Sequence, residues 1–410
     1  MLGTYADLFK NRTIRRSLIA YFISETGDGF TTVALPLFVI ANGGSSALVA
    51  LTFTLNIGAA SVAGFVGGPF VDSFDRRQLV IAVFLGRALL LLVAGLFPSL
   101  ATVIVAATLA GALGSLDNPA MEAAALEVSR GEVERTSAIR NIGYSGAAAI
   151  GPAIAGFVFA WLGAPTAFII DSASFVCAAL LIAATRDYDP HSRIRRARVF
   201  ATTRDRLTFR RITAGFEQIA ATPIVRSYVL YSTLGMVGVS VALVALPVYL
   251  VHNLRFGDVG YGLALAAYAV GSALSLVYYG TKKLHTVLLM CALAYGIAAI
   301  GVGLVPFVVA VVLFRLLWGW AFGLEQIVGD VLIVGATGSE ALGRIYAAYG
   351  VLIKIGAVVG SILAAPIVTF LGSQGAIIAA GIFFAALGVA FFARPALTIS
   401  ILKTSLANDS

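Results

Sequence analysis

Charged residues, cysteine and histidine are all scarce in this chain of 410 residues. Charged side chains make up 12% of it, compared with about 25% in a typical soluble globular protein. The two cysteines lie in apolar segments and the three histidines in loops, so their spacing indicates neither a disulfide framework nor a metal site. No P-loop pattern and no nucleophile–base set is present. We therefore expect no enzyme activity, no cofactor, no metal and no transport driven by the chain's own ATP hydrolysis.

Hydrophobic residues are abundant instead, at 60% of the chain. A membrane-spanning helix needs roughly 20 mainly apolar residues, and twelve segments meet that requirement. The sequence therefore predicts an all-α polytopic membrane protein with twelve transmembrane helices. The predicted spans are 17–40, 46–71, 78–98, 100–122, 141–162, 165–185, 227–250, 259–280, 286–305, 308–333, 346–371 and 374–394.

The basic residues predict the orientation of these helices. If the N-terminus is cytoplasmic, 24 Lys and Arg residues fall in inner segments and only Arg255 in an outer loop. Cytoplasmic loops carry such an excess of positive charge. We therefore expect a multi-pass protein of the cytoplasmic (inner) cell membrane with both termini inside. The net charge of +8 then needs no nucleic-acid partner.

Weak internal repeats divide the chain into two sets of six helices. VALP occurs at 33–36 and 244–247, and WLGAPTAFII (161–170) resembles FLGSQGAIIA (370–379). GSLDNPAME and FGLEQIVGD, which begin at residues 114 and 322, match loosely. Parallel repeats of this kind are related by a pseudo-twofold axis along the membrane normal, with the substrate site between the halves near the midplane. The predicted parts are an N-terminal segment (1–16), a first half (17–185), a basic cytoplasmic linker (186–226), a second half (227–394) and a cytoplasmic tail (395–410).

The loop after the second predicted span carries a family motif. GGPFVDSFDRRQL (67–79) resembles motif A of the major facilitator superfamily, roughly G-x-x-x-D-R-x-G-R-[RK], although positions 73 and 75 depart from it. The residues on the pattern are Gly68, Asp72, Arg76 and Arg77. The resemblance implies a gating loop that latches the cytoplasmic side, with Asp72 near the N-terminus of a partner helix and the arginines beside acidic groups.

Two further motifs fit the same superfamily. GYSGAAAIGPAIAG (143–156) is similar to motif C of its drug–proton antiporters, with Gly151, Pro152 and Gly156 on the pattern. This implies a seal on the outer side, although plain packing of small residues is the alternative. Arg315 and Gly319 fit the R-x-x-x-G core of motif B, but in the tenth predicted span instead of the usual fourth.

Taken over nearly the whole chain, the sequence resembles the branch that includes enterobactin exporters and macrolide efflux proteins. SLDNPAMEAAALEVSRGEVERTSAIRN (115–141) and FRRITAGFEQIAATPIVRS (209–227) carry this resemblance. It implies the major facilitator fold and a secondary-active, proton-coupled antiporter working by alternating access. The implied cargo is a medium-sized amphipathic or cationic organic compound. Proton-coupled import, a uniporter and a non-transporting receptor remain alternatives.

Carboxylates inside the apolar spans are the candidate site residues. A carboxylate in hydrocarbon costs several kcal/mol, on the order of 2.5 or more, unless it is paired, hydrated or protonated. Glu25 and Asp28 are three residues apart and share a helix face, and Asp28 lies roughly 18 Å along its helix, near the midplane. We expect Asp28 first, and Glu25 second, to carry the proton or bind a cation. The alternative is structural, with Asp28 bonded to a neighbouring helix and Glu25 capping a kink at the nearby glycines.

The resemblance implies that the first, fourth, seventh and tenth spans line the central cavity, and the remaining candidates lie on the fourth and the tenth. Asp117, Glu325 and Arg315 complete the expected proton-coupling or substrate set. Asp117 could instead satisfy backbone groups freed by the following proline, and Asp330 could pair with a basic loop. Arg87 needs an acidic partner at membrane depth, which the sequence does not name. As partners we expect a small-molecule substrate, protons and the lipid bilayer, and we expect a monomer.

Overall fold

The computed structural model describes residues 11–128, 133–185, 207–275, 284–337 and 339–393. Its regular structure in these ranges is helical, without a β-strand. The helices are α2 (Arg12–Ala41), α3 (Ser46–Ser73), α4 (Arg76–Leu96), α5 (Leu100–Val128), α6 (Val133–Ala183), α8 (Leu207–Ala221), α9 (Pro223–Val248), the π-helix η1 (Tyr249–Asn253), α10 (Gly257–Leu274), α11 (Leu284–Leu304), α12 (Val308–Ala336) and α13 (Ser339–Phe392).

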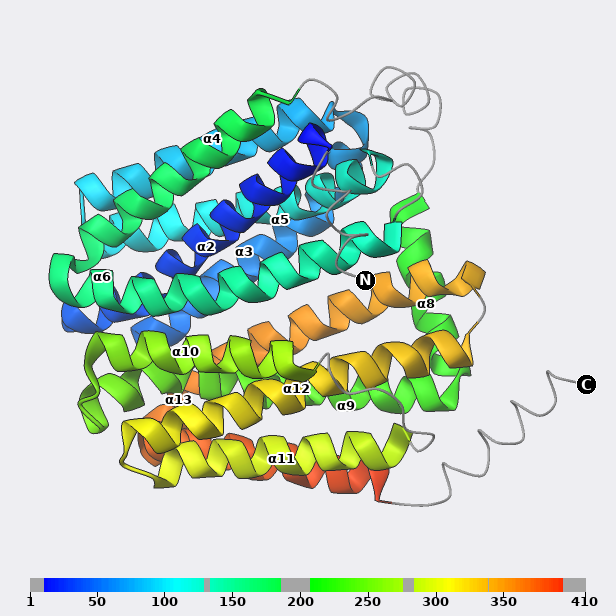
Figure 1. Cartoon of the computed structure of the whole chain (residues 1–410). Coiled ribbons are helices and arrows are strands. Elements are labelled where there is room, and N and C mark those ends of the chain that lie inside the picture. Colours follow the sequence, from blue (N-terminus) through cyan, green and yellow to red (C-terminus); the bar gives the residue numbers. More distant parts are fainter. Residues whose placement is uncertain (1–10, 129–132, 186–206, 276–283, 338, 394–410) are drawn as a thin grey trace, which may run out of the picture. The chain divides into compact units, whose positions relative to one another are not determined.

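The helices group into two compact units. Unit 1 comprises Met1–Asp205 and Arg255–Ala266, and unit 2 comprises Arg206–Leu254 and Ala267–Ser410. Helices α2 to α6 belong to unit 1, and α8, α9, α11, α12 and α13 belong to unit 2. Within each unit the long helices run alongside one another as a bundle (Figure 1).

The predicted spans all fall on helices of the described chain, the span at 259–280 as far as its described part reaches. Eight helices in the described ranges are long and apolar enough to cross a membrane. Helix α2 is not among them, because Glu25 and Asp28 interrupt its apolar sequence. The twelve predicted spans therefore coincide with helices in the described ranges. Eight of these helices are long and apolar enough to be membrane spans by length and composition.

Two of the eight helices each contain two predicted spans, separated by a glycine. Gly163 interrupts α6 with φ 78° and ψ 171°, and Gly372 interrupts α13 with φ 71° and ψ 168°. This backbone region is essentially restricted to glycine. Figure 1 shows α6 turning back on itself. The two glycines occupy matching positions in the repeated sequences WLGAP and FLGSQ, so the two units share this turn.

The helix pairings are also repeated between the units. In unit 1, α6 packs against α2 and α4, and α4 packs against α5. In unit 2, α13 packs against α9 and α11, and α11 packs against α12. Helices α2, α4, α5 and α6 thus have counterparts with matching neighbours in unit 2, namely α9, α11, α12 and α13. This arrangement supports the predicted two-half architecture.

Close approach of helices depends on glycine at a few positions. A Cβ on Gly29 of α2 would lie 2.8 Å from backbone atoms of Gly151 on α6. A Cβ on Gly319 of α12 would lie 1.9 Å from the carbonyl oxygen of Tyr268 on α10. Small residues let helix backbones meet in this way inside a membrane.

We expect Gly319→Ala to destabilise unit 2, because the added methyl group must push α12 away from the α10 backbone. Overpacking of this kind costs about 1–3 kcal/mol. Gly335→Ala is the matched control in the same helix, since a Cβ there meets nothing within 4 Å. Thermal unfolding in detergent should show a lower midpoint for Gly319→Ala alone. Equal midpoints for the two variants would show that the α10–α12 contact is looser than described.

Part of the linker is helical, which the sequence analysis did not predict. Helix α8 packs against α13 and α9 of its own unit. Gly215 makes this contact possible, since a Cβ there would lie 2.1 Å from the carbonyl oxygen of Arg344 on α13. The end of the linker is therefore a packed element of unit 2 and not only a connection.

Candidate functional site

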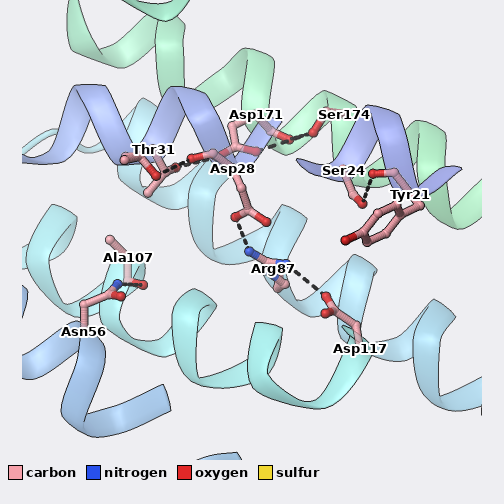
Figure 2. Close-up of polar contacts among 11 residues, drawn as sticks. Tyr21, Ser24, Asp28, Thr31, Asn56, Arg87, Ala107, Asp117, Asp171 and Ser174 are labelled. Carbon is pink, nitrogen blue, oxygen red and sulfur yellow. Dashed lines mark hydrogen bonds and ion pairs between the residues drawn. The ribbon is translucent and has the colours of Figure 1, made fainter. Parts of the chain in front are cut away.

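A buried arginine joins three helices of unit 1. Arg87 on α4 donates from Nη1 to Oδ2 of Asp117 on α5, at 2.9 Å. Its Nη2 donates to Oδ1 of Asp28 on α2. Figure 2 shows the guanidinium between the two carboxylates. One cation is thus shared by two acids, which leaves the group of three with one net negative charge when both are ionised.

The surroundings of Arg87 explain how a guanidinium fits there. Gly114 on α5 leaves room for it, since a Cβ at that position would lie 3.0 Å from Arg87 Cζ. The ring of Phe175 on α6 lies against the guanidinium, with its centroid 4.0 Å from Cζ. Contact with an aromatic face stabilises a desolvated cation. The predicted acid–Arg87 pair is therefore confirmed, and the structure names two acids.

The two acids differ in their access to solvent. The side chain of Asp117 is 4% exposed and that of Arg87 is 7% exposed, whereas that of Asp28 is 34% exposed. Water can therefore reach Asp28 and not Asp117. A proton from solvent would meet Asp28 first, and its uptake would leave Arg87 and Asp117 as a neutral, buried pair.

A third acid of unit 1 lies next to this group. Asp171 on α6 is fully buried. Its Oδ2 accepts a hydrogen bond from Thr31 on α2, and its Oδ1 accepts one from Ser174 at 3.4 Å (Figure 2). Gly27 permits this contact, since a Cβ there would lie 2.5 Å from Asp171 Oδ1. The carboxylate thus links α2 to α6.

Unit 2 has a buried acid of a different kind. Glu325 on α12 is 2% exposed, and its Oε1 accepts a hydrogen bond of 3.1 Å from Ser232 on α9. No other hydrogen bond or ion pair involves Glu325 within the described residues. Glu325 lines a cavity of about 330 Å³ that is otherwise mostly apolar and aromatic.

Arg315 does not lie beside Glu325, although both are on α12. Ten residues of helix separate them by about 15 Å. The Arg315 guanidinium instead lies over the rings of Tyr268 and Trp318, with Cζ 4.8 Å from each centroid. The predicted set of Asp28, Glu25, Asp117, Glu325 and Arg315 is thus divided between the two units.

Glu25 and Asp330 are the other two acidic residues considered in the predicted spans. Glu25 is half-buried on α2, one turn before Asp28. The structural alternative had Glu25 capping a kink at the nearby glycines, whereas α2 continues as one helix through Gly27 and Gly29. Asp330 is exposed and accepts a hydrogen bond of 2.8 Å from Tyr346, where a basic partner was expected.

Arg77 of the motif A segment has partners that differ from those expected. Arg77 donates to the carbonyl oxygens of Ile182 and Ala183 at the C-terminus of α6. A helix C-terminus attracts a cation, so Arg77 needs no acidic group there. Arg76 is buried near the start of α4. Gly68 and Asp72 lie on α3, and the surroundings of both residues fall outside what the structure describes.

The glycine motif of α6 contributes to the contact with α2. A Cβ on Gly151 would lie 2.5 Å from the carbonyl oxygen of Thr26, and Pro152 lies within the same helix. Gly156 follows on α6 and is also buried. Gly151 thus contributes to helix packing, which was the alternative to a seal on the outer side.

Several residues were not singled out by sequence reasoning. Ser232, Tyr346 and Tyr349 line the cavity beside Glu325, but isolated Ser and Tyr in apolar helices give no distinctive pattern. Asp75 departs from motif A, and its carboxylate accepts a 3.1 Å hydrogen bond from the backbone N–H of Gln78. An acidic residue just before a helix is a common cap, so this role could have been recognised.

The described residues include no group of three or more His, Cys, Asp or Glu side chains that could hold a metal ion. The polar groups brought together are carboxylates, one arginine and hydroxyls. Such an arrangement can exchange protons and bind cations inside a membrane, and intramembrane ionisable residues commonly mark ion or substrate pathways.

Comparison with known proteins gives the family. The family model of the Major Facilitator Superfamily matches residues 17–308. The enterobactin exporter EntS of Shigella boydii serotype 4 (strain Sb227) is 25% identical over 344 residues, covering 81% of this chain and 79% of the exporter. EntS of Escherichia coli O127:H6 (strain E2348/69 / EPEC) is 26% identical over the same length and coverage.

Solved structures share the fold at low sequence identity. A mutant of the nucleoside transporter NupG superposes with a TM-score of 0.73 at 13% identity, covering 93% of this chain and 99% of NupG. A POT family transporter, in complex with a thioalcohol-conjugated peptide, gives a TM-score of 0.72 at 12% identity, covering 95% of this chain and 96% of that one. The repeated helix pairings, the membrane-spanning helices and the family match agree. The chain is a multi-pass membrane transporter of the Major Facilitator Superfamily.

Proposed function

We propose that this transporter exports a medium-sized amphipathic or cationic organic compound in exchange for protons. The name of the EntS relatives supports export. The NupG and POT structures, at 12–13% identity, support only the fold. We further propose that the protein lies in the cytoplasmic membrane as a monomer with both termini inside, in agreement with the distribution of its basic residues.

Our proposal of proton coupling rests on the unequal exposure of the two acids that share Arg87. With both acids ionised, the group of three side chains has one net negative charge, and two of the three are buried. Charge in such a place is costly unless it is paired or neutralised. One proton removes that excess charge, and Asp28 is the acid that solvent reaches. Asp28 is therefore our choice for the proton carrier.

The same geometry gives a way for the proton to change the structure. Ionised Asp28 holds α2 to α4 through Arg87, while Asp117 holds α5 to α4. A proton on Asp28 weakens the first of these contacts and leaves the second. Unit 1 then has two states that differ in how α2 is held, which is what a transporter with alternating access needs to link cargo to protons.

Transport by purified protein in proteoliposomes tests this function. A pH-sensitive dye inside the vesicles reports proton flux under an imposed gradient, and cationic dyes, macrolides and siderophore-like compounds are added in turn. We expect at least one compound to evoke proton movement opposite in direction to its own. Movement of both in the same direction would establish import by symport. Substrate movement that ignores the gradient would establish a uniporter, and no movement of any compound would favour a receptor.

A further inference from the structure

The cavity of unit 2 is lined by one acid and several aromatic side chains. Its volume is about 330 Å³, and Glu325 contributes the carboxylate. Phe322, Tyr346, Tyr349 and Phe384 contribute rings to its lining. Tyr346 also donates a hydrogen bond to Asp330. The cavity therefore combines a carboxyl group with aromatic surfaces.

Comparison of the two repeats shows that, among the residues the structure describes, unit 2 has no counterpart of Arg87 beside Glu325. Glu325 follows Asp117 by 208 residues in the matched segments, and Tyr295 follows Arg87 by the same number. In unit 1, the guanidinium of Arg87 lies 4.0 Å from the Phe175 ring centroid. In unit 2, the ring of Tyr295 stacks on Phe384, also with 4.0 Å between the centroids. A phenol thus occupies in unit 2 the place that the acid's arginine occupies in unit 1.

Glu325 consequently has no protein cation to balance its charge in the described part of the chain. Its described polar contact is the hydrogen bond from Ser232. Arg315 is too far along α12, as shown above, and lies over aromatic rings instead. Lys354 is exposed on α13 and does not line the cavity. A carboxylate buried in such an environment would be stabilised by a cation that a bound ligand supplies.

We propose that the cavity is the subsite for the ammonium group of an amphipathic organic amine. Glu325 supplies the counter-charge, and Ser232 holds one of its oxygens so that the other is available. The aromatic side chains supply ring faces, which attract organic cations, and surfaces for the apolar part of the compound. This inference rests on the proposed function only in naming the class of cargo. It assigns the cargo's positive charge to unit 2 and the proton to unit 1.

A pair of probes that differ only in charge tests the subsite. Monodansylcadaverine has an aromatic body and a primary ammonium group, and its N-acetyl derivative has the same body without the charge. Binding of each to the purified full chain in detergent is measured by fluorescence polarisation, without a proton gradient. We expect the amine to bind about tenfold or more tightly than the acetylated probe. Equal affinities would overturn the proposal, and this comparison requires no variant.

Substitution of Glu325 then tests whether this residue causes the preference for the amine over the acetylated probe. We expect Glu325→Gln to weaken binding of the amine about tenfold or more and to change binding of the acetylated probe by less than about twofold. Glu325→Asp keeps the charge and should retain much of the preference, which guards against a folding defect in the first variant. Glu217→Gln, at an exposed position of α8, is the matched control and should bind like the unmodified chain.

The outcomes separate this proposal from proton coupling. If the amine preference persists in Glu325→Gln, the subsite is wrong, whatever the transport assay shows. If Glu325→Gln abolishes proton flux but keeps the amine preference, Glu325 is a proton site and the proposal is also wrong. If the preference depends on Glu325 but no compound moves protons, the subsite stands and the proposed coupling does not.

Discussion

Asp28→Asn is expected to abolish the proton flux evoked by a transported compound, down to the level of empty vesicles. Asparagine has almost the same shape and can still accept a hydrogen bond from Arg87, but it cannot take up a proton. The contact between α2 and α4 is then no longer sensitive to the proton gradient. Exchange of the compound across the vesicle membrane should continue without the gradient, because the substitution removes coupling and not the cargo site.

Asp117→Asn is the matched comparison, since Asp117 binds the same guanidinium from the buried side. It leaves the solvent-reached acid in place but removes the excess negative charge of the group, so we expect a compound-evoked proton flux that is reduced and not abolished. The two variants are measured in the same proteoliposome preparation with the same dye. Flux that is lost in Asp117→Asn and kept in Asp28→Asn would assign the proton to Asp117. Flux that survives in both would make Asp28 and Asp117 structural.

Arg87→Met should be the most destabilising single substitution in unit 1. It removes the cation that two acids share, one of which, Asp117, is buried. Breaking a buried ion pair by removing one partner costs about 3–5 kcal/mol. The free energy of unfolding, measured by titration with a denaturing detergent, should fall by that order.

Removing the acids as well should restore most of the lost stability. In Arg87→Met/Asp28→Asn/Asp117→Asn none of the three side chains is charged, and replacement of a buried ionic group by uncharged residues is often neutral. Arg226→Met is the control at an exposed arginine of α9, for which we expect a change within about 0.5 kcal/mol. A triple variant as unstable as Arg87→Met would show that the guanidinium matters for packing on Phe175 and not for charge.

Hydropathy and the repeat predicted the fold well because both depend only on the order of residues along the chain. Long apolar runs must form helices in a membrane, where backbone groups have no other hydrogen-bond partners. The matching glycines Gly163 and Gly372 lie within the repeated sequences that first suggested two halves. Helix α8 was missed because its residues were interpreted by their charge as a linker. A period of apolar residues close to 3.6 in 207–221 would have indicated a helix.

Partners of the charged residues were predicted less well, since they depend on how helices are rotated against one another. Asp28, Arg87 and Asp117 were each recognised as costly in a membrane, but no spacing along the chain connects three different helices. Arg77 was expected to meet an acid, and it binds the carbonyl groups at the end of α6. Such backbone partners carry no sequence signature. The cavity beside Glu325 was unpredictable for the same reason, as its lining comes from α9, α12 and α13.

The protonation of Asp28 can be measured most directly by infrared difference spectroscopy during a pH titration of the purified protein in lipid. A protonated carboxylic acid gives a C=O stretching band that its carboxylate lacks. We expect a band that appears as the pH is lowered, that is lost in Asp28→Asn and kept in Asp117→Asn, and that diminishes when a transported compound is added. A band that persists in Asp28→Asn would contradict the assignment of the proton to Asp28.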